Sequence, residues 1–292
     1  MGLYGNQIVV KPRNKTEVSK SLIIYSDTGL GKSNLFKNAP NCLYLNLENR
    51  LGHIEGTLKE ERITDIKIFR DTIGNISKEY GRIQKIKTAK AEKDEEALKR
   101  YKTVLKAEYE EYENCAMGKI PYIQLLVVDS TDDIYSMLEG EVKTEMKIDD
   151  LADADRNRAY GRAKNKLLKE IRSCMNVGIT VVFLCGIVKA KEAWNTEDKD
   201  IPFVGSGSAY KAMSRKVTGA FAVDEESDGN RYIYTNPKNK RFFIKNSFDD
   251  IDAGKKLPDK IPLDFSELNK WVNFYTKEEL DTWKKAHNLK KL

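Results

Sequence analysis

The chain has 292 residues, of which 40% are hydrophobic and 33% are charged, and its formal net charge is +6. The hydrophobic content suffices for a packed core, which argues against disorder throughout, and the modest positive charge permits a polyanionic partner without requiring one. No apolar run approaches the roughly 18 residues of a membrane span, so we expect no membrane partner and a cytoplasmic location.

Short apolar segments alternate with helical segments along the chain. Residues 22–25, 42–47, 123–128 and 179–185 are apolar without alternation, as in strands that are covered on both faces. Helical spacing appears between them, for example in residues 162–175, where the apolar side chains share one face. This order predicts an α/β fold with a mostly parallel central sheet.

The first strand leads into a candidate phosphate-binding loop, within SLIIYSDTGLGKSNLF at residues 21–36. The P-loop motif is Gly-x-x-x-x-Gly-Lys-Ser/Thr, and here Ser26 stands in place of the first glycine. Lys32 would neutralise the β- and γ-phosphates of ATP, and the Ser33 hydroxyl would bind Mg²⁺. The residues expected to bind the nucleotide are Ser26, Asp27, Thr28, Gly29, Leu30, Gly31, Lys32, Ser33 and Asn34. Alone, this stretch leaves open a chance Gly-Lys-Ser in a lysine-rich chain.

Two further strands end in carboxylates. CLYLNLENR reaches Glu48, which could polarise a water molecule that attacks the γ-phosphate or could be a surface glutamate at a strand end. IQLLVVDS ends in Asp129, which would hold Mg²⁺ as in a Walker B strand, or else would cap the following helix. The joint occurrence of the loop, the following strands and the strand that ends in Asp129 predicts a P-loop NTPase fold.

A charged segment interrupts the alternation between these two strands. Basic and acidic residues are nearly equal in number over residues 78–113, and apolar side chains recur there at helical spacing. We expect a helical insertion at about residues 76–118 that folds back or projects from the core of a single domain, residues 1–292. It is either a solvated helix or an arm that contacts another subunit.

The C-terminal part predicts an antiparallel hairpin followed by two helices. RYIYT and RFFIK flank residues 236–240, which have the composition of a turn. Asp264 with Glu267, and Thr276 with Glu279, have the spacing of a capping box and predict the two helix starts.

The sequence resembles the RecA-like ATPases, and among them the phage nucleotide-binding proteins associated with single-strand annealing and recombination. The resemblance is carried by SLIIYSDTGLGKSNL, NAPNCLYLNLENRLG, LLVVDSTDD and GITVVFLCGIVK, with KLPDKIPLDFSELNKW near the end. It implies a RecA-like P-loop core, ATP with Mg²⁺, and Glu48 as the catalytic base. The family usually has a polar sensor, often His or Gln, where this sequence has Gly186.

The resemblance also implies that the polar stretch after Gly186 meets single-stranded DNA. Its basic residues would neutralise phosphates and an aromatic residue would stack on bases. The candidates are Lys189, Lys191, Lys211, Arg215 and Lys216 for phosphates, and Trp194 or Phe203 for bases. The alternatives are a mobile surface loop with solvated lysines, or Lys189 and Lys191 reaching the γ-phosphate of a neighbouring subunit.

Two functions follow from this interpretation. The first is an ATP-hydrolysing protein that acts on single-stranded DNA in phage recombination, annealing or replication. It would form a ring or filament of identical subunits, could work with a single-stranded-DNA-binding protein, and would lie in the cytoplasm of a bacterial host. The second is a nucleotide-binding scaffold or loader that has lost hydrolysis and mainly binds protein partners.

Overall fold

The structure is a computed structural model, and it describes residues 9–10, 20–36, 39–48, 59–117, 122–152, 156–191, 198–203, 207–248 and 257–286. Within these residues, no helix is long and apolar enough to cross a membrane. Trp194 lies outside the described residues, and so do the side chains of Lys191 and Lys211.

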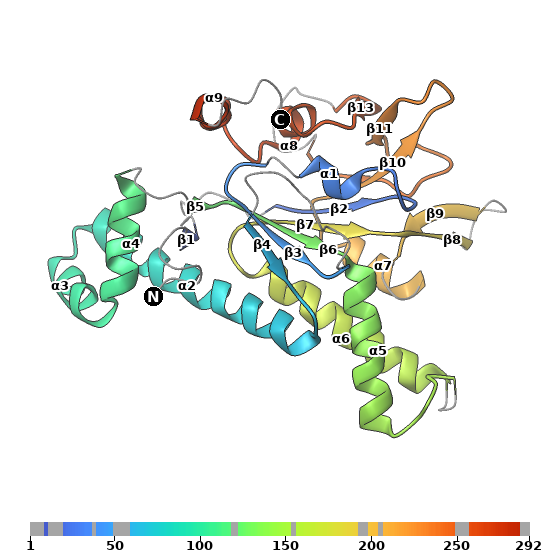
Figure 1. The fold of residues 1–292 in the computed structure, drawn as a ribbon, viewed down its shortest axis with the longest axis horizontal. Coiled ribbons are helices and arrows are strands. Elements are labelled where there is room, and N and C mark those ends of the chain that lie inside the picture. Colours follow the sequence, from blue (N-terminus) through green and yellow to red (C-terminus); the bar gives the residue numbers. More distant parts are fainter. Residues whose placement is uncertain are drawn as a thin grey trace.

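The described residues form a nine-stranded central sheet, in the order β13-β11-β10-β2-β7-β6-β3-β4 with β12 beside β10 (Figure 1). The parallel part consists of β2 (Ser21–Tyr25), β7 (Thr180–Cys185), β6 (Leu125–Asp129), β3 (Cys42–Asn46) and β4 (Lys59–Arg62). On the other side of β2, β10 (Gly219–Glu225) is parallel to it, whereas β11 (Arg231–Tyr234), β12 (Lys245–Asn246) and β13 (Lys260–Pro262) are antiparallel additions. The predicted α/β fold with a mostly parallel central sheet is confirmed.

The four central strands are buried along their whole length, which explains their unalternating apolar sequences. Every residue of β2, β3, β6 and β7 is buried. The predicted strand over residues 123–128 is in fact divided. Ile123 belongs to β5 (Tyr122–Ile123), which pairs with β1 (Val9–Val10) outside the main sheet, and β6 begins only at Leu125.

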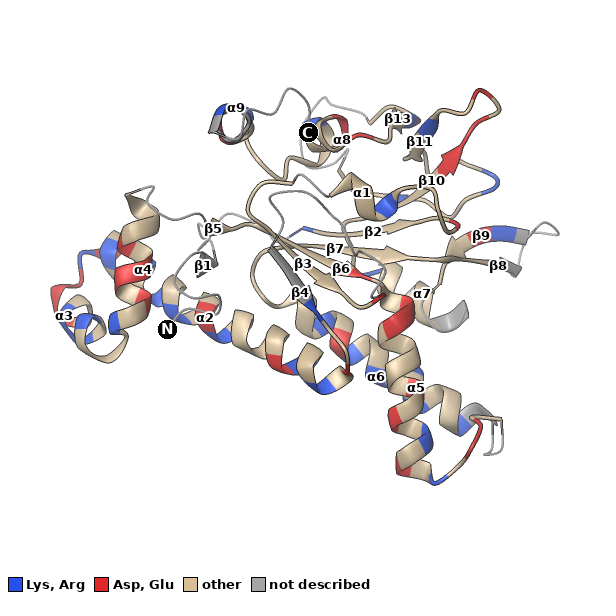
Figure 2. Ribbon diagram, in the orientation of Figure 1, with Lys and Arg blue, Asp and Glu red and all other residues tan. Residues whose placement is uncertain are grey.

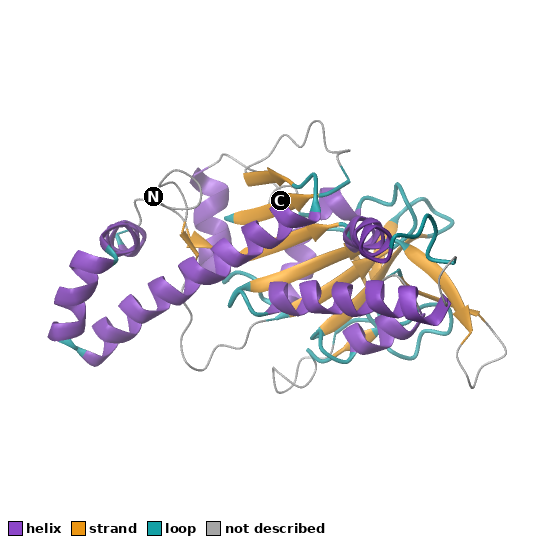
Figure 3. Cartoon of the chain, turned by 90° about the horizontal axis from the view of Figure 1, so that it is seen from below, coloured by secondary structure: helices purple, strands orange, loops and turns teal. Residues whose placement is uncertain are grey.

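Helices cover both faces of the sheet (Figures 1 and 3). On one face lie α2 (Ile66–Glu92), α5 (Thr131–Met146) and α6 (Arg156–Met175), the last beginning before the predicted residue 162. On the other lie α1 (Lys32–Leu35), α8 (Phe265–Val272) and α9 (Lys277–Ala286). The predicted caps are present: the Asp264 side chain accepts from Glu267 N at 3.0 Å, and Thr276 and Glu279 exchange hydrogen bonds of 2.8 and 3.2 Å.

The charged segment forms a helical arm. The end of α2, α3 (Glu95–Val104) and α4 (Lys106–Ala116) extend beyond the edge of the sheet, with both signs of charge on their surfaces (Figure 2). The chain turns back after α2, so that Arg82 pairs with Glu108, and Lys90 pairs with Glu113 and lies over the rings of Tyr109 and Tyr112. Because α2 begins at Ile66, the helical segment starts ten residues before the expected boundary.

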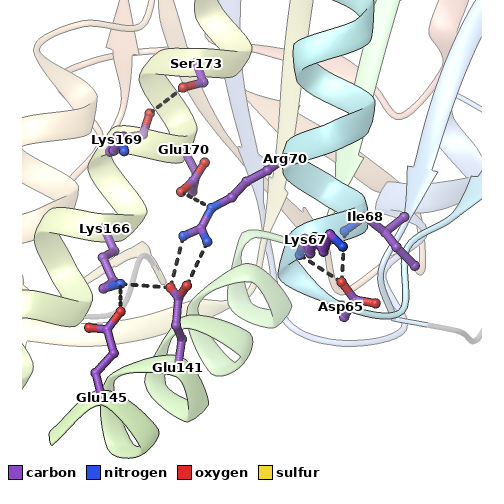
Figure 4. A network of polar contacts seen from close by, with 10 residues as sticks. All are labelled: Asp65, Lys67, Ile68, Arg70, Glu141, Glu145, Lys166, Lys169, Glu170 and Ser173. Atoms are coloured by element: carbon purple, nitrogen blue, oxygen red, sulfur yellow. Dashed lines mark hydrogen bonds and ion pairs between the residues drawn. The ribbon is translucent and has the colours of Figure 1, made fainter.

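An ion-pair network joins the three helices on one face (Figure 4). Arg70 of α2 donates to both carboxylate oxygens of Glu141 on α5, at 2.8 and 3.0 Å, and to Glu170 on α6 at 2.8 Å. Lys166 of α6 contacts Glu141 at 3.0 Å. These bonds, with Arg70 foremost, lower the pKa of Glu141 to about 2. The network fixes α5, which directly follows the Asp129 strand, against the base of the arm.

The predicted pairing of the C-terminal hairpin is wrong. Arg231–Tyr234 pairs with the preceding Gly219–Glu225, and residues 241–244 form no strand with it. The connecting turn contains Asp228 and Gly229, and Gly229 has a φ of 77° that glycine adopts without steric cost. Asp-Gly between two apolar runs is a strong sequence signal for a β-hairpin, and here it marks the turn that joins β10 to β11.

Candidate nucleotide-binding site

The loop between β2 and α1 has the backbone of a phosphate-binding turn. Its positive φ angles fall on Gly29 (86°) and Gly31 (91°), and α1 begins directly afterwards at Lys32. Ser26, at the place of the missing first glycine, is buried and is not among the residues with positive φ. A glycine is therefore not required at position 26, which accounts for the departure from the motif. Asp27, Thr28 and Gly29 are exposed at the tip of the loop, where a ligand can reach them.

Lys32 is held across the entrance of the loop. Its Nζ donates to Ser26 O at 2.9 Å, to Ser26 Oγ at 2.8 Å and to Asp27 O at 3.1 Å. Burial lowers the pKa of Lys32, and the negative charges of Asp129, Asp132 and Glu48 oppose that shift. The Ser26 hydroxyl as an acceptor for Lys32 was not anticipated from the sequence. It gives the atypical serine a role that glycine cannot fill.

Ser33 and Asp129 are brought together as predicted for the metal site. The Ser33 hydroxyl donates to Asp129 Oδ2 at 2.6 Å, and the Tyr44 hydroxyl donates to the same oxygen. Asp129 is 2% exposed, and burial raises its pKa, while the bonds from Ser33 and Tyr44 oppose the rise. The role of Tyr44 could not be predicted from the sequence, because this residue lies in the middle of an apolar strand whose pattern indicates only a buried core.

This donor set fits Mg²⁺. The ion is usually held by one or two carboxylates and by substrate phosphates, not by a cage made wholly of protein ligands. A hydroxyl oxygen and a carboxylate oxygen 2.6 Å apart, beside the phosphate-binding loop, provide the two hard oxygen ligands that the protein would contribute.

Glu48 follows β3 at the same edge of the sheet. β3 is parallel to β6, with Asn46 opposite Asp129, and Leu47 N donates to Asp129 O at 2.6 Å. Glu48 is thus one residue beyond this contact, and its charge acts on Lys32. The half-buried carboxylate lies on the side of the site where the predicted metal ligands are.

A further carboxylate, Asp132, lies at the end of β7. Gly186 N donates to Asp132 Oδ2 at 2.9 Å and to Oδ1 at 3.3 Å. A Cβ on residue 186 would lie 2.5 Å from Asp132 Oδ2, so a larger side chain would collide with this carboxylate. Burial raises the pKa of Asp132 to about 6. Asp132 thus occupies the space in which the polar side chain of the family would lie at position 186. The sequence alone does not show this contact.

The residues predicted to meet DNA are not gathered into one surface by the described contacts. Lys189 is exposed on β8 (Ile187–Lys191), which pairs with β9 (Asp198–Pro202) in a separate ribbon. Arg215 and Lys216 are exposed just after α7 (Gly207–Ser214), the helix that contains Lys211.

Phe203 is partly buried and packs against α5. Its ring lies 6.2 Å from that of Tyr135, edge to face, and its carbonyl accepts from Thr131 at 3.3 Å. Phe203 N donates to Gly186 O at 2.9 Å. The start of α5 therefore contacts the base of the β8–β9 ribbon, where the chain enters it at Gly186, bonded to Asp132, and leaves it at Phe203, bonded to Thr131.

One comparison with known proteins, a family model, agrees with a nucleotide-binding protein. A family model described as AAA domain matches residues 19–248. Among solved structures, the chain is similar to a KaiC-like protein from the hyperthermophilic archaeon Pyrococcus horikoshii OT3, with 13% sequence identity and a TM-score of 0.34 over 74% of this chain and 77% of that one. Similarity at that score is too weak to bear on function. No curated protein matches the chain.

Proposed function

The chain belongs to the AAA domain family and is a P-loop nucleotide-binding protein, and from this premise we propose that it binds and hydrolyses ATP with Mg²⁺ and acts on single-stranded DNA. The observation that carries the proposal is the junction of Lys32, Ser33 and Asp129 at one edge of the sheet, with Glu48 beside them. Hydrolysis, the DNA substrate and the recombination role go beyond the family assignment.

Each residue has a distinct task in the proposed reaction. Lys32 exchanges its contacts with Ser26 and Asp27 for phosphate oxygens, which offset the cost of keeping its charge in a buried position. Ser33 and Asp129 would hold the metal ion. When bound, Mg²⁺ neutralises the charge that develops on the phosphate oxygens. Glu48 orients the attacking water and accepts its proton, a general-base role that requires an ionised carboxylate.

The polynucleotide part of the proposal is supported by the exposed basic residues and by the resemblance to phage recombination proteins. Lys189 is exposed on the β8–β9 ribbon and Arg215 is exposed just after α7, and exposed cations can contact a phosphate backbone. We propose that Lys191, Trp194 and Lys211 also contact the DNA. We also propose one RecA-like ATPase domain over residues 1–292, with the arm as an insertion, assembled as a ring or filament.

The second candidate is a nucleotide-binding scaffold or loader without hydrolysis. It is favoured by one observation: a carboxylate, Asp132, lies at the end of β7 within the electrostatic surroundings of Lys32. An ionised carboxylate near a γ-phosphate repels it, which would slow turnover while leaving binding to the loop possible.

Phosphate release separates the two candidates. The full chain would be incubated with ATP and Mg²⁺, with and without a single-stranded oligonucleotide, and Lys32→Ala would serve as the control for contaminating ATPases. Release that depends on Lys32 and rises with DNA supports the first candidate. A rate of phosphate release that is the same with and without DNA contradicts the proposed DNA substrate. Binding of ATP without any phosphate release supports the scaffold.

A further inference from the structure

The carboxylate of Asp132 lies at the tip of β7, between the phosphate-binding loop and the predicted metal site. β7 pairs on one side with β2, which leads into the loop, and on the other with β6, which ends in Asp129 (Figure 1). Gly186 directly follows β7, and its N donates to Asp132 Oδ2 at 2.9 Å. This bond fixes the carboxylate between the strand of the loop and the strand of the metal site.

Within the part of the chain that the structure describes, no ion pair neutralises the charge of Asp132. Its oxygens accept from Gly186 N and from the hydroxyl of Thr131, which lies 3.3 Å from Oδ1. Lys32 attracts this charge without an ion pair, because its Nζ donates to oxygens of the loop. Burial raises the pKa of Asp132 to about 6, so the carboxylate is ionised at about pH 8.

The third phosphate of a nucleoside triphosphate would be directed toward this carboxylate. Lys32 would contact the β- and γ-phosphates, and Mg²⁺ at Ser33 and Asp129 would bridge the same two phosphates. The γ-phosphate would thus lie between the loop and the end of β6, at the tip of β7. A nucleoside diphosphate ends one phosphate earlier. Because like charges that share a partly buried site repel each other, the charge of Asp132 acts mainly on the triphosphate.

We propose that Asp132 is a specificity-determining residue, and that its negative charge makes the site bind a nucleoside diphosphate more tightly than a nucleoside triphosphate. The loop, Lys32 and Ser33 serve both nucleotides, whereas Asp132 opposes only the γ-phosphate. The proposal rests on nucleotide binding at the loop, whether or not the chain hydrolyses ATP, and deepens it by naming the preferred nucleotide.

The test compares the affinities for ADP and for AMP-PNP, an ATP analogue that resists hydrolysis, each with Mg²⁺. Isothermal titration calorimetry on the full chain at about pH 8 keeps Asp132 ionised. Asp132→Asn removes the charge and keeps an oxygen that can accept from Gly186 N. Asp149→Asn is the matched control, because Asp149 is exposed beyond the far end of α5, a helix about 24 Å long. Circular dichroism checks that each variant folds.

In the wild type, ADP should bind at least about tenfold more tightly than AMP-PNP. Asp132→Asn should bind AMP-PNP at least about tenfold more tightly than the wild type does and ADP within about twofold of it, because only the longer nucleotide reaches position 132. Asp149→Asn should keep both wild-type affinities. Equal or tighter binding of AMP-PNP than of ADP by the wild type would overturn the preference, and this comparison needs no variant.

The remaining outcomes separate this proposal from nucleotide binding itself. If folded Asp132→Asn changes both affinities by the same factor, or has the affinities of Asp149→Asn, the charge does not select between the nucleotides. The specificity role is then overturned, and nucleotide binding at the loop stands. If the wild type binds neither nucleotide, nucleotide binding is overturned and the specificity role falls with it.

Discussion

The nucleotide-binding loop and the β8–β9 ribbon both follow buried parallel strands, yet the structure fixes their side chains to different degrees. At the loop, Lys32 has three acceptors and Ser33 is bonded to a 2%-exposed carboxylate. On the ribbon, Lys189 is exposed. A buried charge is stable only with partners, whereas an exposed lysine is equally stable with or without a function. Geometry therefore supports a role for the first region more strongly than for the second.

The two regions are joined through the start of α5. Asp132 accepts from the backbone of Gly186, where the ribbon begins, and Thr131 donates to Phe203, just after it ends. Both residues follow Asp129 by two or three positions. Residues 129–132 therefore connect the nucleotide site and the ribbon by direct contacts, so a variant in one region should also be tested for effects in the other.

The largest effect is expected at the loop. Lys32→Ala should abolish ATP·Mg²⁺ binding without unfolding the protein, because it removes the cation that offsets the triphosphate charge. Calorimetric titration with ATP would measure the loss, and Lys189→Ala, an exposed lysine on the ribbon, is the matched control. Unchanged ATP affinity in a folded Lys32→Ala protein would mean that the nucleotide binds elsewhere. The loop would then have no stronger claim to a function than the β8–β9 ribbon.

The next effect concerns turnover. Glu48→Gln should keep ATP binding and lower hydrolysis at least tenfold, about 1.4 kcal/mol of barrier, because glutamine cannot accept a proton from water. Single-turnover phosphate release with bound ATP is the appropriate measurement. Turnover equal to that of the wild type would assign the base to another residue, and Asp132 would then be the first candidate to examine.

A smaller effect is expected for the segment that links the regions. The folded pKa of Asp132 is raised to about 6, above the unfolded value near 3.9. The folded state therefore binds more protons between these values, and this residue reduces stability as the pH rises from about 4 to about 6. Asp132→Asn should relieve that cost, by about 1–2 kcal/mol at neutral pH, while an amide oxygen still accepts from Gly186 N.

Urea unfolding of wild type and Asp132→Asn at about pH 7 and about pH 5 would test this, because the other titrating groups cancel in the difference between the proteins. The advantage of the variant should be greater at the higher pH. The same difference at both values would mean that Asp132 titrates normally in the folded protein.

The same contrast explains what could be predicted from the sequence. The central strands, the glycine loop and the pairing of Ser33 with Asp129 follow from local patterns, since parallel strands bring their carboxyl ends to one edge. Tyr44, Asp132 and the Ser26 hydroxyl could not be predicted, because their roles depend on which distant segments the fold brings together. The strand pairing in the C-terminal part was predicted wrongly for another reason. The apolar runs on both sides of Asn236 and Pro237 resemble a hairpin, but the turn that forms one is at Asp228 and Gly229.

The smallest effect is expected on the ribbon, and it would show whether exposure there conceals a function. If Lys189 contacts the backbone of single-stranded DNA, it displaces a condensed counterion, which contributes roughly −0.7 to the slope of log affinity against log salt. Lys189→Ala should flatten the slope by about that amount, and the triple change with Lys191→Ala and Lys211→Ala should flatten it by about two units.

Lys99→Ala, which changes an exposed lysine on the arm, is the control for a general loss of positive charge. Fluorescence anisotropy on a labelled oligonucleotide at several salt concentrations, with ATP held constant, would give the slopes. If Lys189→Ala, the triple variant and Lys99→Ala all keep the wild-type slope, these lysines do not contact the DNA backbone, and the DNA assignment for residues 189–216 should be withdrawn.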